Sequence, residues 1–276
     1  MERNAFNIAI DGPAGAGKST IARMAARRLG FIYVDTGAMY RAIALYFLRQ
    51  GVPAGDEAAA GQAVAGADIT IRYQDGEQQV LLNGENVSGL IRTEEVGNMA
   101  SSVSAYPAVR AHLLELQRSL AAGADVIMDG RDIGTCILPD ADVKIYLSAS
   151  PSVRAMRRYK ELKEKGEACN LAEIEQDIIE RDERDRNRAV SPLRQAEDAV
   201  YVDSSEMTIE QVVEAILAEA RAKGLDAGSQ ASGSQASGGQ TAGDQAAGGP
   251  VSESQAPGDS DAGERERAGS DQEDAG

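Results

Sequence analysis

Tryptophan is absent from this chain of 276 residues, and aromatic residues make up only 4% of it. Stacking on aromatic rings is therefore a poor candidate for its main mode of recognition. The two cysteines, Cys136 and Cys169, are too few for a disulfide framework or a cysteine-rich metal cluster, which is typical of a reducing cytoplasm. No apolar run approaches the roughly 18 residues that a membrane span needs, and residues 1–11 are too short and mixed for a signal peptide. We therefore expect a cytoplasmic protein with no membrane partner.

Positive charge is also scarce, since 28 Lys and Arg residues stand against 44 Asp and Glu residues, a formal net charge of −16. Polyanions repel such a chain, which argues against non-specific binding to nucleic acid or to an anionic membrane. Hydrophobic residues make up 42% of the sequence, enough for a globular protein with a packed core. The length allows one large domain or two modest ones.

The composition changes sharply after Leu225. Residues 226–276 are almost entirely Gly, Ala, Ser, Gln, Asp and Glu, and their ten acidic residues and two arginines carry −8 of the net charge. Such a segment buries too little apolar surface to offset the entropy of ordering. We therefore expect a disordered acidic tail behind a globular domain of residues 1–225. A solvated tail is favoured over one with a specific partner, and the second possibility stays open.

Short apolar runs alternate with amphipathic stretches in the first 225 residues. The predicted strands, each almost continuously apolar, are Phe6–Ile10, Phe31–Val34, Val126–Met128, Val143–Leu147 and Ala199–Val202. The predicted helices are Ser19–Leu29, Ala38–Arg49, Pro107–Ala121, Ser152–Glu164, Ala172–Arg188 and Thr208–Lys223, with Ser152 and Thr208 as capping candidates. This alternation is typical of an α/β fold with a doubly wound parallel sheet, here of five strands.

One segment interrupts the alternation with a period of two. Residues 69–73 and 79–82 alternate polar and apolar side chains, and the pairs Asp75-Gly76 and Asn83-Gly84 are hairpin turn signals. We expect a small antiparallel β insertion within about residues 53–105 that forms a lid or a substrate wall. A surface hairpin without a function is the alternative.

Residues 12–20 carry the strongest local motif. They are Gly12, Pro13, Ala14, Gly15, Ala16, Gly17, Lys18, Ser19 and Thr20. Residues 12–19 match G-x-x-x-x-G-K-[ST] between a predicted strand and a predicted helix. The glycines let backbone N–H groups point at a phosphate, and the helix adds its positive N-terminal end. We expect Lys18 to reach the β- and γ-phosphates and Ser19 to offer its hydroxyl to Mg²⁺. Asp129, which ends the third predicted strand, is a second candidate near the metal, directly or through water.

Arginines gather in three segments that a generic nucleotide-binding switch would not need. Residues 35–41 follow the second predicted strand, residues 129–135 follow the third, and residues 180–188 hold four arginines among acidic residues. In the last run, helical spacing would place Arg181, Asp185 and Arg188 on one face. A solvated, salt-bridged helix is the alternative for that run alone. The combination with the phosphate loop favours a polyanionic ligand.

These motifs together give the chain a resemblance to the bacterial cytidylate kinases, within the nucleoside monophosphate kinases. They read Gly-Pro-x-Gly-x-Gly-Lys at 12–18, Asp-x-Gly-x-x-Tyr-Arg at 35–41, Asp-Gly-Arg-Asp-x-Gly-Thr at 129–135 and Arg-Asp-x-Arg-Asp-x-Asn-Arg at 181–188. The resemblance covers residues 4–223. It implies a P-loop fold that moves the γ-phosphoryl group of ATP, with Mg²⁺, onto CMP or dCMP, and a short helical lid within about residues 152–170. We expect a monomer.

The resemblance also implies a role for each matching residue. The acceptor phosphate would be held by Arg41, Arg131 and Arg188, with Thr36 and Tyr40 beside it. The sugar would face Arg181 and Asp185, and the cytosine would be read by Ser101, Arg110 and Asp132. Arg157 or Arg158 would close over the transferring group, so the catalytic set would be Lys18, Arg131, Arg158 and Arg188. A general base is not required, because the acceptor phosphate is already an anionic nucleophile.

Other functions stay open from the residues alone. The acceptor could be UMP, AMP or a small non-nucleotide molecule. A regulatory GTPase-type switch would need a guanine-reading Asn-Lys-x-Asp run, which the sequence lacks. An interaction protein driven by its acidic tail would be separated from an enzyme by its activity after truncation at Leu225.

Overall fold

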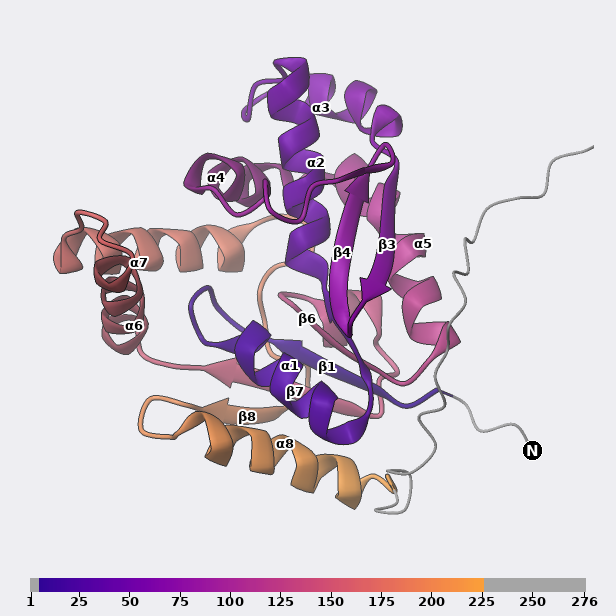
Figure 1. Ribbon diagram of the computed structural model, residues 1–276, viewed down its shortest axis with the longest axis vertical. Coiled ribbons are helices and arrows are strands. Elements are labelled where there is room, and N and C mark those ends of the chain that lie inside the picture. The colour runs from indigo at the N-terminus through magenta and orange to yellow at the C-terminus, as the bar shows by residue number, and fades with distance from the viewer. Residues whose placement is uncertain (1–4, 226–276) are drawn as a thin grey trace, which may run out of the picture. The chain divides into compact units, whose positions relative to one another are not determined.

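The computed structural model describes residues 5–225, which form a central sheet flanked by helices (Figure 1). Five parallel strands make up this sheet in the order β2-β6-β1-β7-β8. They are β1 (Asn7–Asp11), β2 (Ile32–Asp35), β6 (Val126–Gly130), β7 (Val143–Ser148) and β8 (Val200–Asp203). All five predicted strands are confirmed, with ends shifted by one or two residues. The expected acidic tail, residues 226–276, lies outside the described residues.

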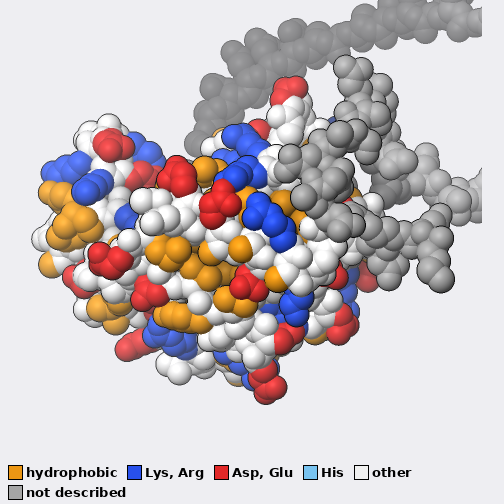
Figure 2. Space-filling view, turned by 90° about the horizontal axis from the view of Figure 1, so that it is seen from below, with side chains coloured by type: hydrophobic (Ala, Val, Ile, Leu, Met, Phe, Trp, Pro, Cys, Tyr) orange, Lys and Arg blue, Asp and Glu red, His pale blue; other side chains and the backbone are white. Residues whose placement is uncertain are grey.

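Six helices also occur where the sequence predicts them. They are α1 (Lys18–Leu29), α2 (Thr36–Gln50), α5 (Pro107–Gly123), α6 (Pro151–Glu164), α7 (Leu171–Asn187) and α8 (Ile209–Ala222). No helix within residues 5–225 is long and apolar enough to cross a membrane. On the face shown in Figure 2, basic and acidic side chains are interspersed around apolar patches, so neither sign of charge dominates it.

The sheet separates two hydrophobic cores, as the alternation of side chains along β1 shows. Ile8 and Ile10 pack into the core that α1 and α8 cover, whereas Ala9 between them belongs to the core that α2 and α5 cover. All three residues are fully buried. Burial on both faces explains why the strands read as continuous apolar runs in the sequence.

Strand register brings the acidic strand ends to one edge of the sheet. Asp35 of β2 pairs with Asp129 of β6, and Asp11 of β1 pairs with Gly130 of the same strand. In a doubly wound sheet, ligands bind at the carboxyl ends of the strands. The phosphate loop follows directly from Asp11, so the register fixes where its ligand lies.

The segment between α2 and α5 contains the expected antiparallel sheet and more. Its elements are α3 (Glu57–Ala63), a 3₁₀ turn (Val64–Gly66), β3 (Ile69–Gln74), β4 (Glu77–Leu82), β5 (Glu85–Asn86) and α4 (Glu94–Val103). Both predicted turns have two residues with positive φ, at Asp75-Gly76 and Asn83-Gly84, which is the pattern of tight hairpin connections. The sequence did not predict α3 or α4.

Two local expectations about helices α6 and α7 are wrong. Ser150, not Ser152, caps α6: its hydroxyl accepts a hydrogen bond from the Val153 N–H at 3.3 Å. Pro151 occupies the first helical position, where a missing N–H costs nothing. Arg188 lies beyond the end of α7, since its backbone is extended at φ −64° and ψ 141°. The expectation for Thr208 is confirmed, because it forms a capping box with Gln211 at the start of α8.

Candidate active site

The phosphate loop has the backbone geometry that its glycines permit. Gly12, Gly15 and Gly17 all have positive φ. A Cβ on Gly12 would lie 1.9 Å from the carbonyl oxygen of Leu147 on β7, so no other residue fits there. Helix α1 begins at Lys18 without a side-chain cap on its first N–H groups. These free donors, together with the helix dipole, form an anion-binding end.

Lys18 is buried at the base of this loop. Its Nζ donates a hydrogen bond to the carbonyl oxygen of Pro13 at 2.8 Å. Burial lowers the pKa of the lysine well below its ordinary value, and the positive charge of Arg131 acts in the same direction, while Asp129 and Asp11 oppose the shift. An anion in the loop would favour the charged form in the same way as those carboxylates.

Asp129 sits against the first turn of α1. Its carboxylate accepts hydrogen bonds from the Ser19 hydroxyl at 3.0 Å and from the Tyr33 hydroxyl at 2.9 Å. Burial raises the pKa of Asp129 to about 6, and the nearby charge of Asp35 adds to the shift. The predicted pair of Ser19 and Asp129 is therefore brought together. Tyr33, which the sequence analysis did not single out, orients the carboxylate from β2.

The residues that follow β2 point toward the same edge. Asp35 caps α2 by accepting the Ala38 N–H at 2.9 Å, and Thr36 donates through Oγ1 to the carbonyl oxygen of Asp129 at 2.8 Å. The guanidinium of Arg41 lies 3.9 Å from Asp35 Oδ2, and that of Arg92 lies at the same distance from that atom. Arg92, from the insertion, was not among the predicted site residues.

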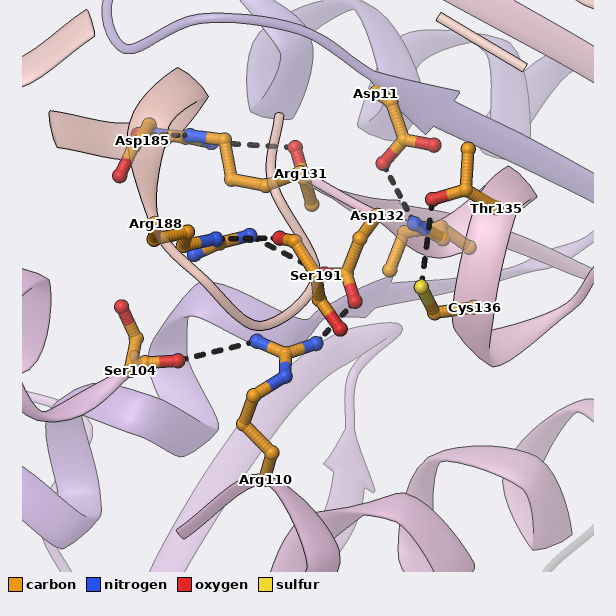
Figure 3. A network of polar contacts seen from close by, with 12 residues as sticks. Asp11, Ser104, Arg110, Arg131, Asp132, Thr135, Cys136, Asp185, Arg188 and Ser191 are labelled. Atoms are coloured by element: carbon orange, nitrogen blue, oxygen red, sulfur yellow. Dashed lines mark hydrogen bonds and ion pairs between the residues drawn. The ribbon is translucent and has the colours of Figure 1, made fainter. Parts of the chain in front are cut away.

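Asp132 lies near two arginines that come from different parts of the chain (Figure 3). Arg110 on α5 donates a hydrogen bond through Nη2 to its carboxylate, and Nη2 of Arg188 lies 3.8 Å from its other oxygen. The Arg110 guanidinium also lies over the ring of Tyr40, 5.8 Å from its centre. The structure thus brings together two of the three residues predicted to read the base.

Ser101, the third residue predicted to read the base, is connected to Arg110 through Ser104. Ser101 lies on α4, and its carbonyl oxygen accepts a hydrogen bond from the Ser104 hydroxyl at 3.0 Å. The carbonyl oxygen of Ser104 in turn accepts Nη1 of Arg110 at 3.2 Å. The insertion therefore contributes directly to the placement of Arg110.

Helix α7 supplies Arg181 and Asp185, the two residues predicted to face the sugar. Nε of Arg131 donates a hydrogen bond to Asp185 Oδ2 at 3.0 Å. Burial acts to raise the pKa of Asp185, but Arg131 and Arg181 outweigh it and hold that pKa below the ordinary value. Burial lowers the pKa of Arg181 to about 10, and the positive charge of Arg131 adds to the effect.

Several guanidinium nitrogens in this region are buried without a hydrogen-bond partner. Among the described residues they include Nη1 of Arg41, Nε of Arg181 and Nη2 of Arg188. A buried donor without an acceptor is costly and rare in folded proteins. Nη1 of Arg41 and Nη2 of Arg188 each have a carboxylate oxygen within 4 Å, but beyond hydrogen-bond distance. The resemblance assigns all three residues to one ligand, the acceptor nucleotide, whose oxygens could accept from these donors.

The two predicted lid arginines differ in their surroundings. Arg157 donates through Nη2 to the Ser204 carbonyl oxygen at 2.7 Å, after β8, whereas Arg158 pairs with Glu161 at 3.0 Å on the surface of α6. Neither is placed on the phosphate loop, and their role stays a prediction. The arginine that does contact the loop is Arg154, whose Nη1 donates to the Ala14 carbonyl oxygen at 2.8 Å. Arg154 was missed, although its position one turn before Arg158 was a signal.

Known proteins resemble this chain over most of its described residues. The sequence profile of the family described as "Cytidylate kinase" matches residues 8–222. The chain belongs to the cytidylate kinase family. A cytidylate kinase from Geobacter sp. (strain M21) is 50% identical over 215 residues, which are 78% of this chain and 92% of that protein. One from Aeromonas salmonicida (strain A449) is 47% identical over 229 residues, 83% of this chain and all of that protein. The resemblance read from the four motifs is therefore confirmed, and the matched region of the family extends from β1 to the last residue of α8.

Proposed function

We propose that this protein transfers the γ-phosphoryl group of ATP to CMP or dCMP, giving ADP and CDP or dCDP. The observation that carries the proposal is the set of buried guanidinium nitrogens without a hydrogen-bond partner on Arg41, Arg181 and Arg188, at the sheet edge that also holds the phosphate loop. An enzyme that transfers a phosphoryl group between two bound nucleotides needs such donors on its acceptor side. Membership of the cytidylate kinase family supports the same reaction.

The donor side uses the loop of residues 12–20. Its N–H groups and the start of α1 would hold the ATP phosphates, and Lys18 would exchange its bond to Pro13 for one to a phosphate oxygen. Placing a cation beside the transferring phosphoryl group stabilises the charge that spreads over its oxygens. Arg157 or Arg158 would complete this neutralisation from α6.

The acceptor side uses arginines in place of a general base. Arg41, Arg131 and Arg188 would bind the phosphate of the monophosphate, while Arg181 and Asp185 would face its sugar. The acceptor phosphate is itself the nucleophile, so no proton has to be removed from it. Catalysis then consists of placing two phosphates in line and neutralising their charge.

The pair of Asp132 and Arg110 supports cytosine as the base. Cytosine presents an exocyclic amine that donates and an N3 that accepts, and uracil reverses both roles. An ionised Asp132 only accepts hydrogen bonds and Arg110 only donates them, so the pair complements cytosine. Uracil would leave buried polar groups mismatched, at a cost of a few kcal/mol.

Magnesium fits the donor set beside the loop. Mg²⁺ is usually held by one or two protein oxygens together with substrate phosphates and water, and the Ser19 hydroxyl and Asp129 carboxylate are two such oxygens in hydrogen-bond contact. Those two residues would hold the ion, which would supply charge neutralisation between the β- and γ-phosphates. Tyr33 keeps the carboxylate oriented toward Ser19.

The domain organisation, the location and the oligomeric state of the enzyme belong to the same proposal. Residues 1–225 would form the kinase domain, with the insertion as its acceptor-binding part and α6 and the following loop as its lid. The two free cysteines, Cys136 and Cys169, support a cytoplasmic location. A monomer without a nucleic-acid or membrane partner stays a prediction.

An assay of ADP formation with a panel of acceptors tests the proposal. ATP and Mg²⁺ are supplied with CMP, dCMP, UMP, AMP or GMP at equal concentration, and a reaction without an acceptor serves as the control. We expect rapid turnover with CMP and dCMP only. Hydrolysis that does not depend on an acceptor, or a preference for another monophosphate, would contradict the proposal.

A further inference from the structure

A buried carboxylate at the end of β1 is assigned no contact with either nucleotide in the chemistry proposed so far. Asp11 is only 5% exposed, and each of its oxygens accepts one backbone N–H, that of Ile133 at 2.8 Å and that of Gly134 at 2.8 Å. The two amides lie more than a hundred residues away in the sequence. Gly12, the first residue of the phosphate loop, follows Asp11 directly.

The segment that Asp11 holds is an unusual helical turn. Residues Ile133–Ile137 form a π-helix that begins after Asp132, and Asp132 makes no side-chain hydrogen bond to the turn that it precedes. The first N–H groups of any helix lack partners within the helix and are often capped by the side chain of the preceding residue. Here the cap is the side chain of Asp11, at the end of β1.

Because Asp11 caps the turn, the Asp132 side chain is available for another use. An Asp at the capping position normally folds back onto the first amides of its own helix. Because Asp11 already satisfies those amides, the Asp132 carboxylate instead meets Arg110 and lies near Arg188, as Figure 3 shows. The contact between Asp132 and Arg110 therefore depends on Asp11, which lies outside the motif of residues 129–135.

We propose that Asp11 is a positioning residue for the acceptor nucleotide: it caps the turn after Asp132, directs the Asp132 carboxylate toward Arg110, and links that carboxylate rigidly to the phosphate loop. One residue thus sets the acceptor base relative to the ATP phosphates. The inference rests on the proposed function, in which Asp132 reads cytosine.

Close packing around the turn makes its position sensitive to Asp11. A Cβ on Gly134 would lie 3.2 Å from the Lys144 side chain and 3.5 Å from Asp11 Oδ2. A side chain at position 134 would therefore crowd the Lys144 side chain of β7 and touch the capping carboxylate. The side-chain amide of an Asn at position 11 has a single acceptor oxygen. It would accept a hydrogen bond from only one of the two N–H groups and place its own NH2 group against the other.

The test compares kcat and KM for CMP, UMP and ATP in the wild type, Asp11→Asn and Gly134→Ala. For Asp11→Asn we expect kcat/KM for CMP to fall about tenfold or more, with a smaller CMP-over-UMP ratio and a KM for ATP within about twofold of the wild type. Gly134→Ala disturbs the same contact from the other side, and a weaker effect of the same kind is expected. Asp142→Asn is the matched control, because Asp142 accepts the Asn7 N–H at 2.8 Å at the opposite end of β1.

The outcomes separate a positioning role from a structural one. If folded Asp11→Asn only melts at a lower temperature and keeps its constants for CMP and its base preference, Asp11 serves stability alone and the inference is overturned. The inference is also overturned if Asp11→Asn does not fold and Gly134→Ala leaves both constants unchanged. A wild type that shows no preference for CMP would instead overturn the proposed function.

Discussion

The Nζ atom of Lys18 donates a hydrogen bond to the carbonyl oxygen of Pro13, five residues earlier in the same loop, at 2.8 Å. The lysine is buried, and burial together with the charge of Arg131 lowers its pKa. A buried ammonium with a single carbonyl partner is poorly compensated for the loss of water. A phosphate in the loop supplies the compensation, so the free structure already favours binding of an anion.

Replacing this lysine should abolish turnover and preserve the fold. In Lys18→Ala the transferring phosphoryl group loses its cation, and we expect kcat to fall by about three orders of magnitude. Circular dichroism should show an unchanged fold, because the hydrogen bond that Lys18 makes among the described residues stays within its own loop. Lys223→Ala, at the exposed end of α8, is the control. Near-normal turnover of folded Lys18→Ala would refute the assignment of the loop.

Arg188 should not tolerate a conservative replacement. Its Nη2 is buried without a hydrogen-bond partner, and a lysine lacks the planar fork that a phosphate binds. For Arg188→Lys we expect a loss of about tenfold or more in the rate of phosphoryl transfer, measured in single turnovers, with little change in ATP affinity. Exposed Arg194 offers the matched control, Arg194→Lys. Equal losses in rate and ATP affinity would point to a structural ion pair instead.

The ion pair between α6 and α7 should contribute strongly to stability. Arg154 and Asp182 are 1% and 2% exposed at their side chains and lie 2.6 Å apart. Removing one charge leaves the other buried without its partner, so Asp182→Asn should lower the free energy of unfolding by about 3 kcal/mol. Glu161→Gln breaks exposed pairs with Arg158 and Lys165 and should cost less than about 1 kcal/mol. Urea denaturation measures both, and equal costs would contradict the account.

Asp11 should make stability depend on pH. Burial is the main cause that raises its pKa to about 6, above the ordinary value of 3.8. The folded state therefore binds more protons between pH 4 and 6 than the unfolded state, and stability falls as pH rises through that range. The free energy of unfolding of the wild type minus that of Asp11→Asn should increase as pH is lowered from 7 to 5. A difference that stays constant or decreases would show that Asp11 is charged throughout.

Much of the fold could be predicted because local signals agree with the tertiary structure. The strands are buried on both faces and read as apolar runs, and the hairpin turns carry Asp-Gly and Asn-Gly. Helix α4 was missed although Thr93 accepts the Val96 N–H as its cap and two glutamates follow in its first turn. The signal was present, but Gly97 and the short length concealed it.

The parts that could not be predicted depend on contacts between distant segments. The π-helical turn after Asp132 is held by Asp11, more than a hundred residues earlier, and no local pattern encodes that. Helical spacing placed Arg188 on the face of Arg181 and Asp185. The helix ends at Asn187, and Leu193 N–H instead bonds back to the Asp185 carbonyl oxygen at 2.8 Å. Arg188 lies near Asp132 after the helix has ended, and helical periodicity does not predict that position.

The central claim, that the site is built for cytosine, is tested most directly by one pair of ratios. The measurement is kcat/KM for CMP and for UMP in the wild type and in Asp132→Asn, with the KM for ATP as the control for folding. An Asn amide donates as well as accepts, so it tolerates the uracil pattern and fits the cytosine amine less well. We expect a wild-type preference for CMP of about a hundredfold or more, and a much smaller preference in the variant, chiefly through lower activity on CMP. A ratio unchanged by the substitution would show that Asp132 does not read the base and would contradict the account.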